Sequence, residues 1–123
     1  MKKIHTAQAP KAIGPYSQAI LVWNTLYSSW QIGLDPQTMK LVEWIEKQTH
    51  QVCKNLKSVV EEAWFKLENI VKTTIFLANI DDFKVVNEIY WQYFSHKPAR
   101  STVQVVKLPL WALVEIEIIA VKN

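Results

Sequence analysis

One arginine and two glutamates are the residues of this chain whose types and spacing best suit chemistry. Arg100 stands in the run Pro98-Ala99-Arg100-Ser101, and a guanidinium fork is the natural receptor for a small carboxylate. Glu115 and Glu117 interrupt an apolar run, so in a strand they share one face, roughly 6–7 Å apart. An acidic face must meet water or another subunit, which predicts a site. The opposite face would form core, from Val114, Ile116 and Ile118.

Two helices and five strands must position these groups. Apolar residues at three- and four-residue steps predict an amphipathic helix over residues 45–63. Asp81 is expected to cap a second helix that runs to about residue 94. The order ββαβαββ indicates an α+β fold with one mixed sheet and both helices on one face. Strands are predicted over residues 17–22, 25–32, 69–78, 102–107 and 113–121.

The strand over residues 69–78 is apolar on both sides, so the sheet face away from the helices cannot all be solvated. Self-association is the simplest way to bury it.

Length and composition predict a single soluble domain. The chain has 123 residues, half of them hydrophobic and a fifth charged, which is enough for a hydrophobic core. A net charge of +3 is too weak to indicate nucleic acid binding. A single cysteine, Cys53, allows no internal disulfide, and no signal peptide or membrane segment is recognisable. We therefore expect a cytoplasmic protein.

No cofactor is expected. His5, His50 and His96 are isolated and lack metal-ligand spacing, and no glycine-rich phosphate loop occurs.

Several blocks in register give the chain a family resemblance. The segment from Ala9 to Ala19, APKAIGPYSQA, resembles the opening of the RidA family, also called YjgF/YER057c/UK114. Later blocks are similar too, at residues 71–77, 82–87, 98–101, 108–109 and 114–117. The resemblance implies a chorismate-mutase-like subunit and a homotrimer with sites at the subunit interfaces. It also implies hydrolysis of enamine or imine intermediates, such as 2-iminopropanoate, to a 2-keto acid and ammonia.

The resemblance also suggests roles for particular residues. Arg100 would hold the substrate carboxylate and Glu115 would polarise the attacking water. Tyr16, at the pocket wall, would donate a hydrogen bond to substrate or water. Backbone groups near residues 30 and 102 would bind the imine nitrogen. Further contacts to substrate are expected from Ser29, Trp30, Asn87 and Thr102.

Each role has a structural alternative. Arg100 and Glu115 could form ordinary surface or cross-strand ion pairs, and a structural ion pair is favoured for Glu117. Tyr16 could be a packed aromatic residue and Asn87 a buried amide with core partners. A ribonuclease and a non-catalytic carboxylate-binding trimer are the alternative functions.

Tryptophan is unusually frequent and glycine unusually rare. The chain has six tryptophans but only two glycines, where average usage predicts roughly nine glycines. Replacement of glycine and natural divergence are the two explanations. We expect left-handed backbone (positive φ) at several of these positions, where a Cβ costs about 1–2 kcal/mol. Tryptophan stands where the family pattern has glycine at Trp23, Trp30, Trp44, Trp64 and Trp111, with Trp91 as a further candidate.

Overall fold

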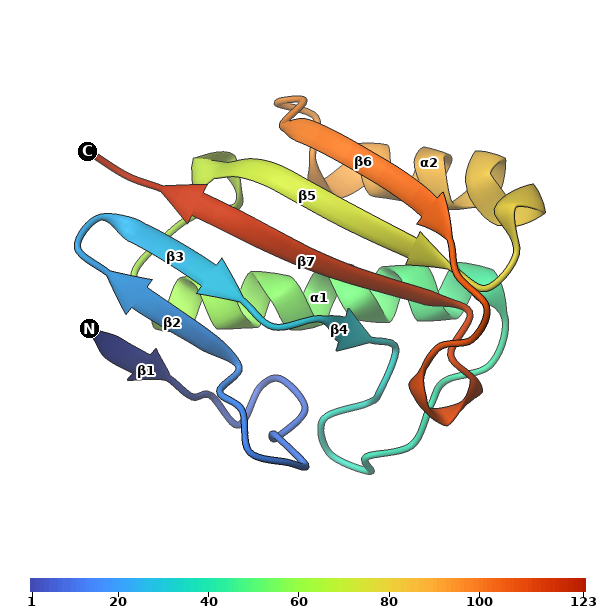
Figure 1. Cartoon of the computed structure of the whole chain (residues 1–123), viewed down its shortest axis with the longest axis horizontal. Coiled ribbons are helices and arrows are strands. Elements are labelled where there is room, and N and C mark those ends of the chain that lie inside the picture. The colour runs from blue at the N-terminus through green and yellow to red at the C-terminus, as the bar shows by residue number, and fades with distance from the viewer.

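A mixed sheet of seven strands forms the centre of the computed structural model, which describes residues 1–123 (Figure 1). The strand order is β1-β2-β3-β7-β5-β6, with the short β4 pairing beside β7. β5 and β6 run parallel and every other pair is antiparallel. The strands are β1 (Lys2–Ile4), β2 (Ala19–Val22), β3 (Thr25–Ser28), β4 (Gln31–Ile32), β5 (Ile70–Leu77), β6 (Ala99–Gln104) and β7 (Val114–Val121).

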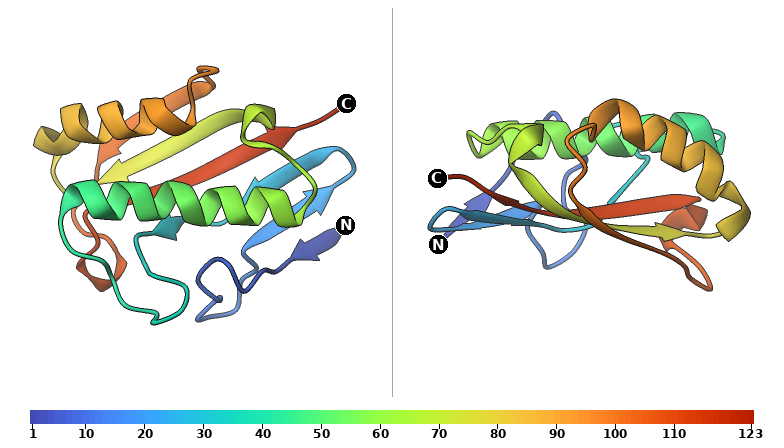
Figure 2. Two further views of the ribbon diagram at one scale, coloured as in Figure 1. Left: turned by 180° about the vertical axis from the view of Figure 1, so that it is seen from behind. Right: turned by 90° about the horizontal axis from the view of Figure 1, so that it is seen from above.

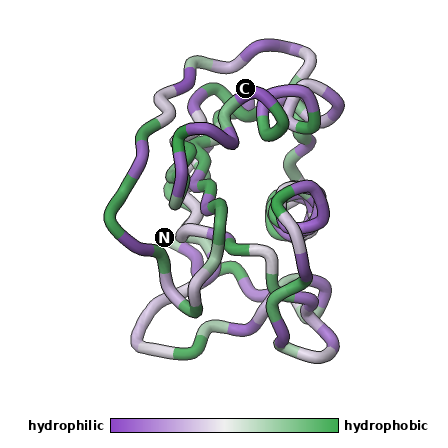
Figure 3. Tube along the Cα trace, turned by 90° about the vertical axis from the view of Figure 1, so that its right-hand side faces the viewer, coloured by the Kyte–Doolittle hydropathy of each residue, from purple (hydrophilic) through white to green (hydrophobic).

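Two helices cover one face of the sheet and leave the other face open (Figure 2). They are α1 (Ile45–Glu62) and α2 (Phe83–Tyr93). Figure 3 shows α1 nearly end-on, with its hydrophobic residues toward the sheet. The expected mixed sheet with both helices on one face is therefore confirmed.

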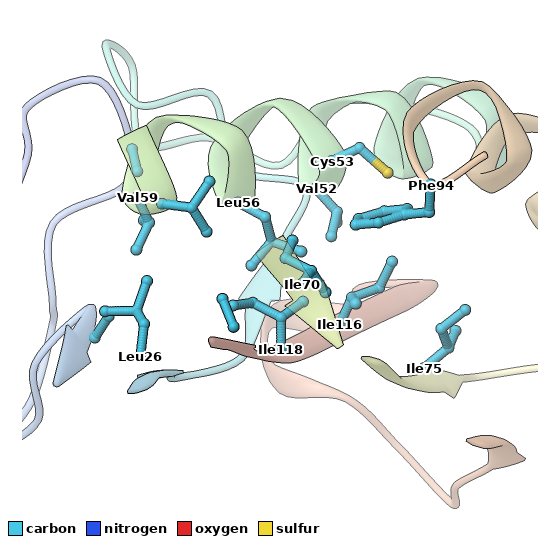
Figure 4. Packing of buried hydrophobic residues seen from close by; sticks show 14 of the residues in the cluster. Leu26, Val52, Cys53, Leu56, Val59, Ile70, Ile75, Phe94, Ile116 and Ile118 are labelled. Carbon is cyan, nitrogen blue, oxygen red and sulfur yellow. The ribbon is translucent and has the colours of Figure 1, made fainter. Parts of the chain in front are cut away.

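The core lies between these helices and the sheet (Figure 4). From α1, Val52, Leu56 and Val59 are fully buried in the same cluster as Ile116 and Ile118 of β7. The predicted alternation of β7 is thus confirmed, because its even-numbered residues from 114 to 118 are buried. Cys53 is buried as well, and burial raises the pKa of its thiol far above the usual value. No helix combines the length and apolar character needed to cross a bilayer.

Several boundaries differ from those predicted. The predicted strand 25–32 is broken after Ser28, where residues 29 and 30 turn away before β4 begins. β6 starts at Ala99, because its parallel ladder with β5 begins at the pair Lys72↔Ala99. β1 was not anticipated.

The expected Asp81 cap is wrong. α2 is preceded by a 3₁₀ turn, Ile80–Asp82, and the side chain of Asn79 caps that turn by accepting from the Asp81 backbone N–H at 2.9 Å. An Asn side chain satisfies an orphan N–H as well as Asp does. α2 itself begins at Phe83 without a side-chain cap.

Four of the six tryptophans have left-handed backbone, as expected for glycine positions. The φ angles are 55° at Trp23, 67° at Trp44, 64° at Trp64 and 62° at Trp111. Trp23 is the first central residue of the β2–β3 turn, a place where glycine relieves the clash of Cβ. Trp64 follows α1 in a Schellman arrangement, where the Phe65 N–H donates to the Val60 carbonyl at 2.9 Å.

The other two tryptophans have ordinary backbone. Trp30 has no positive φ, and Trp91 lies inside α2 with helical backbone. Positive φ therefore favours replacement of glycine at Trp23, Trp44, Trp64 and Trp111, and the backbone gives no such indication at Trp30 and Trp91.

Candidate functional site

A cleft of about 530 Å³ opens on the sheet face away from the helices. Glu115 and Glu117 of β7 line it, because they alternate with the core residues of that strand. The N-terminal loop forms one wall through Ile13 and Tyr16. The expected acidic face is therefore present, and it is hollowed rather than flat.

A single buried amide holds the N-terminal wall in place. Gln18 accepts from the Thr6 backbone N–H at 2.7 Å and donates to the Pro10 carbonyl at 2.8 Å. These bonds fold the loop back over the sheet and bring Lys11 to the cleft. Lys11 is not among the residues predicted from the sequence, because only the fold of this loop places it at the cleft with the glutamates.

Glu115 is the most unusual group in the cleft. Its side chain is only 4% exposed, and its Oε2 atom has no hydrogen-bond partner. Burial, together with the charge of Glu117, raises the pKa of Glu115 to about 7. A buried carboxyl without a partner is costly, so it indicates a position kept for a ligand, a water or a proton.

Glu117 does not form the structural ion pair that was favoured for it. The one ion pair of the protomer joins Lys57 and Glu61 on α1. Glu117 instead lines the cleft beside Glu115 and raises the pKa of that neighbour. The negative charge of Glu117 therefore favours the protonated form of Glu115.

Three of the predicted substrate contacts lie in the same cleft. Tyr16 is half-exposed, and its hydroxyl accepts from the Ile13 backbone N–H at 3.4 Å. The Ser29 hydroxyl donates to the Ser17 carbonyl at 2.6 Å, which leaves its oxygen lone pairs to accept from a ligand. The Trp30 indole packs on Phe76 with ring centroids 5.0 Å apart, so it forms a wall of the cleft as expected.

Arg100 lies on the other side of the sheet. Its Nη1 donates to Oδ1 of Asn87 on α2 at 2.7 Å, and its guanidinium carbon lies 4.9 Å from the Tyr90 ring centroid. These residues belong to a second cleft, of about 410 Å³, between α2 and the start of β6. Arg100 thus faces the helices, whereas Glu115 faces away from them.

Thr102 shares the Arg100 side of β6. It pairs with Ile75 of β5, is half-buried, and its Oγ1 has no hydrogen-bond partner. The structure therefore places Arg100, Asn87 and Thr102 together, apart from Glu115 and its cleft.

The separation is too large for a small ligand within one protomer. β5 lies between β7 and β6, so the strands carrying Glu115 and Arg100 are roughly 10 Å apart. The two side chains also project from opposite faces. One small carboxylate can contact both groups only if they come from different copies of the chain.

The chain resembles known proteins over almost its full length. Residues 6–122 match the family described as Endoribonuclease L-PSP. A RutC family protein of Aquifex aeolicus is 54% identical over 125 residues, covering 99% of this chain and 100% of the relative. Human 2-iminobutanoate/2-iminopropanoate deaminase is 49% identical over 122 residues, covering 98% of this chain and 89% of the relative.

A solved structure agrees with these sequence matches. The YjgF gene product of E. coli superimposes with a TM-score of 0.96 at 40% identity, over 100% of both chains. The fold is accordingly chorismate-mutase-like, with the mixed sheet and two helices described above. The chain belongs to the YjgF/RidA family, described as Endoribonuclease L-PSP.

Proposed function

We propose that this protein hydrolyses 2-imino acids of the 2-iminopropanoate type to 2-keto acids and ammonia. The observation that carries the proposal is Glu115, a buried carboxyl with a free oxygen and a pKa of about 7 at the floor of an open cleft. A group poised near neutral pH suits proton transfer from water. The name of the human relative, 2-iminobutanoate/2-iminopropanoate deaminase, supports the same reaction.

The reaction needs one positioned water and one anion receptor. Ionised Glu115 takes a proton from water as the water oxygen bonds to the iminium carbon, giving a 2-amino-2-hydroxy acid. Glu115 returns that proton to the amino nitrogen, and the C–N bond then breaks so that ammonia leaves. The ionised Glu115 accepts the hydroxyl proton as the carbonyl forms, and it loses that proton to water before the next turnover. Arg100 of a neighbouring copy binds the carboxylate and fixes the carbon above the water. No cofactor is required, because the iminium carbon is already electrophilic.

The experiment that tests the proposal generates 2-iminopropanoate or 2-iminobutanoate enzymatically and follows ammonia release with and without the protein. Accelerated release supports it. Ammonia release at the spontaneous rate would contradict it and favour a non-catalytic carboxylate-binding protein. Cleavage of RNA without imine hydrolysis would favour a ribonuclease.

Arg100→Lys should keep the charge and lose most substrate binding. Lysine offers a point charge where a carboxylate needs two parallel N–H donors. We expect KM to rise about 10- to 100-fold with a smaller change in kcat, as follows from loss of one charged hydrogen bond. Steady-state kinetics checks this, and an unchanged KM would remove Arg100 from the site.

The pH dependence follows from the raised pKa of Glu115. The carboxylate is the active form, so kcat should fall as pH drops through about 7. Glu117→Gln removes a neighbouring negative charge, makes Glu115 easier to ionise, and should shift this acidic limb to lower pH. Measuring kcat against pH for the wild type and for Glu117→Gln tests this shift. An identical limb in the variant would show that Glu117 does not act on the group that titrates.

The chain should form a homotrimer. The open sheet face exposes Tyr27, Trp30 and Val103 by 44–48%, and a monomer would leave these residues in water. A neighbouring copy would cover them and bring Arg100 to the Glu115 cleft. Light scattering at micromolar concentration should give three times the chain mass. A monomer would contradict both the trimer and the supply of Arg100 by a neighbouring copy.

A further inference from the structure

We propose that Asn87 and Tyr90 act as positioning residues that hold Arg100 in a carboxylate-binding pose. The inference rests on the proposed function for its substrate, but the arrangement itself lies within one protomer. It changes the expected role of Asn87, from a contact to substrate to a contact to the residue that binds substrate.

Asn87 fixes one end of the guanidinium. Its Oδ1 accepts from Nη1 of Arg100 at 2.7 Å, a charge-assisted bond. Asn87 lies in the middle of α2, whereas Arg100 is an exposed residue of the edge strand β6. A long exposed arginine loses much rotamer entropy when it binds a ligand, so prior fixation lowers that cost.

Tyr90 packs against the guanidinium. The Arg100 guanidinium carbon lies 4.9 Å from the Tyr90 ring centroid and 5.5 Å from that of Phe83. Tyr90 is 5% exposed, and its hydroxyl is hydrogen-bonded to that of buried Thr73 at 2.7 Å. The ring is therefore itself held from the core of the sheet.

The remaining donors of Arg100 are free. Asn87 uses one N–H of Nη1, and the protomer provides no hydrogen-bond partner for Nε or Nη2. Those two nitrogens form the edge that binds a carboxylate in the bidentate manner. The arrangement presents this edge ready-made to a ligand held by a neighbouring copy.

The test compares Asn87→Ala with the exposed neighbour Glu88→Ala as a matched control on the same helix. Alanine is a better helix former than asparagine, so helix stability does not fall. We expect Asn87→Ala to raise KM for 2-iminopropanoate about tenfold with little change in kcat, while Glu88→Ala matches the wild type. In an Arg100→Lys background, Asn87→Ala should have almost no further effect on KM, because the guanidinium that Asn87 orients is absent.

Tyr90 is tested by a pair of variants. Tyr90→Phe keeps the ring but loses the hydroxyl bond to Thr73, so it should raise KM less than Tyr90→Leu, which removes the ring itself. Thermal unfolding of both identifies any loss of folding.

Calorimetry with pyruvate separates this inference from the proposed function. Pyruvate binding that weakens in Asn87→Ala supports the inference even if no imine is hydrolysed. Imine hydrolysis with an unchanged KM in Asn87→Ala overturns the inference and leaves the function standing. Absence of both hydrolysis and pyruvate binding in the wild type overturns both.

A second inference has an independent basis in the backbone. Of seven non-glycine residues with positive φ, four are tryptophans, and neither glycine has positive φ. Trp44 has φ 67° and ψ 149°, a region that is essentially confined to glycine. The four indoles are 66–95% exposed, so little packing compensates the strained backbone. The positions at issue are Trp23, Trp44, Trp64 and Trp111.

We infer that these four positions are glycine in the polypeptide that the source cell makes. One codon can mean tryptophan in one genetic code and glycine in another. Translation of the gene with the wrong code would then put tryptophan in place of glycine wherever that codon occurs. UGA, which some codes assign to tryptophan and another to glycine, is such a codon. The exchange also explains why glycine is rare and tryptophan frequent in the same chain.

Peptide mass spectrometry of the protein isolated from its source cell tests this inference. Peptides covering the four positions should have the masses of glycine-containing sequences. Tryptophan masses at these positions, or UGG codons for them in the gene, would overturn it.

Discussion

Replacing Glu115 by glutamine should lower kcat for 2-iminopropanoate hydrolysis by about 10²–10⁴-fold, the usual contribution of a general base. Glutamine has nearly the same shape as glutamate, so the cleft and the binding of substrate are preserved. It cannot accept a proton from water. KM should therefore change little, and the comparison requires only steady-state ammonia release by the two proteins.

Glu62→Gln is the matched control, since Glu62 is an exposed glutamate at the end of α1. It should behave as the wild type. If Glu115→Gln keeps its turnover, the water is activated by another group, and Glu117 would be the first to examine because it lines the same cleft.

Changing all four left-handed tryptophans to glycine should stabilise the protein by roughly 2–4 kcal/mol. Each positive φ costs about 1–2 kcal/mol for a residue with a Cβ, offset by about 0.5–1 kcal/mol for the greater flexibility of unfolded glycine. The indoles are largely exposed, so their removal loses little apolar burial. Urea unfolding at one protein concentration measures the gain. The variant combines Trp23→Gly, Trp44→Gly, Trp64→Gly and Trp111→Gly.

Trp91→Gly provides the opposite control. Trp91 lies inside α2, where glycine costs about 1 kcal/mol relative to a good helix former. This variant should be less stable than the parent. A quadruple variant that is no more stable than the parent would mean that the tryptophans fit their left-handed positions without strain.

The strands and helices with strong periodic patterns could be predicted from the sequence. In β7 the alternation of glutamate with branched apolar residues assigned Glu115 to one face and Ile116 to the other. The structure agrees, because Glu115 lines the cleft whereas Ile116 lies in the core cluster. The apolar face of α1 was equally clear. β1 was missed because its three residues include two lysines and carry no alternation.

The division of the candidate site could not be predicted. Whether Arg100 and Glu115 share a face depends on the parallel register of β6 on β5, which pairs Arg100 with buried Thr73. Sequence periodicity within β6 gives no such register. The wall formed by Lys11 and Ile13 depends likewise on the long-range hydrogen bonds of Gln18.

The most direct test of a site shared between copies mixes two inactive variants, Arg100→Ala and Glu115→Gln. The two are unfolded together and refolded so that their subunits combine. If each site takes Arg100 from one copy and Glu115 from another, random mixing at equal amounts should restore about a quarter of wild-type imine hydrolysis. Activity no greater than the sum of the two separate variants would place both groups in one chain and contradict the account.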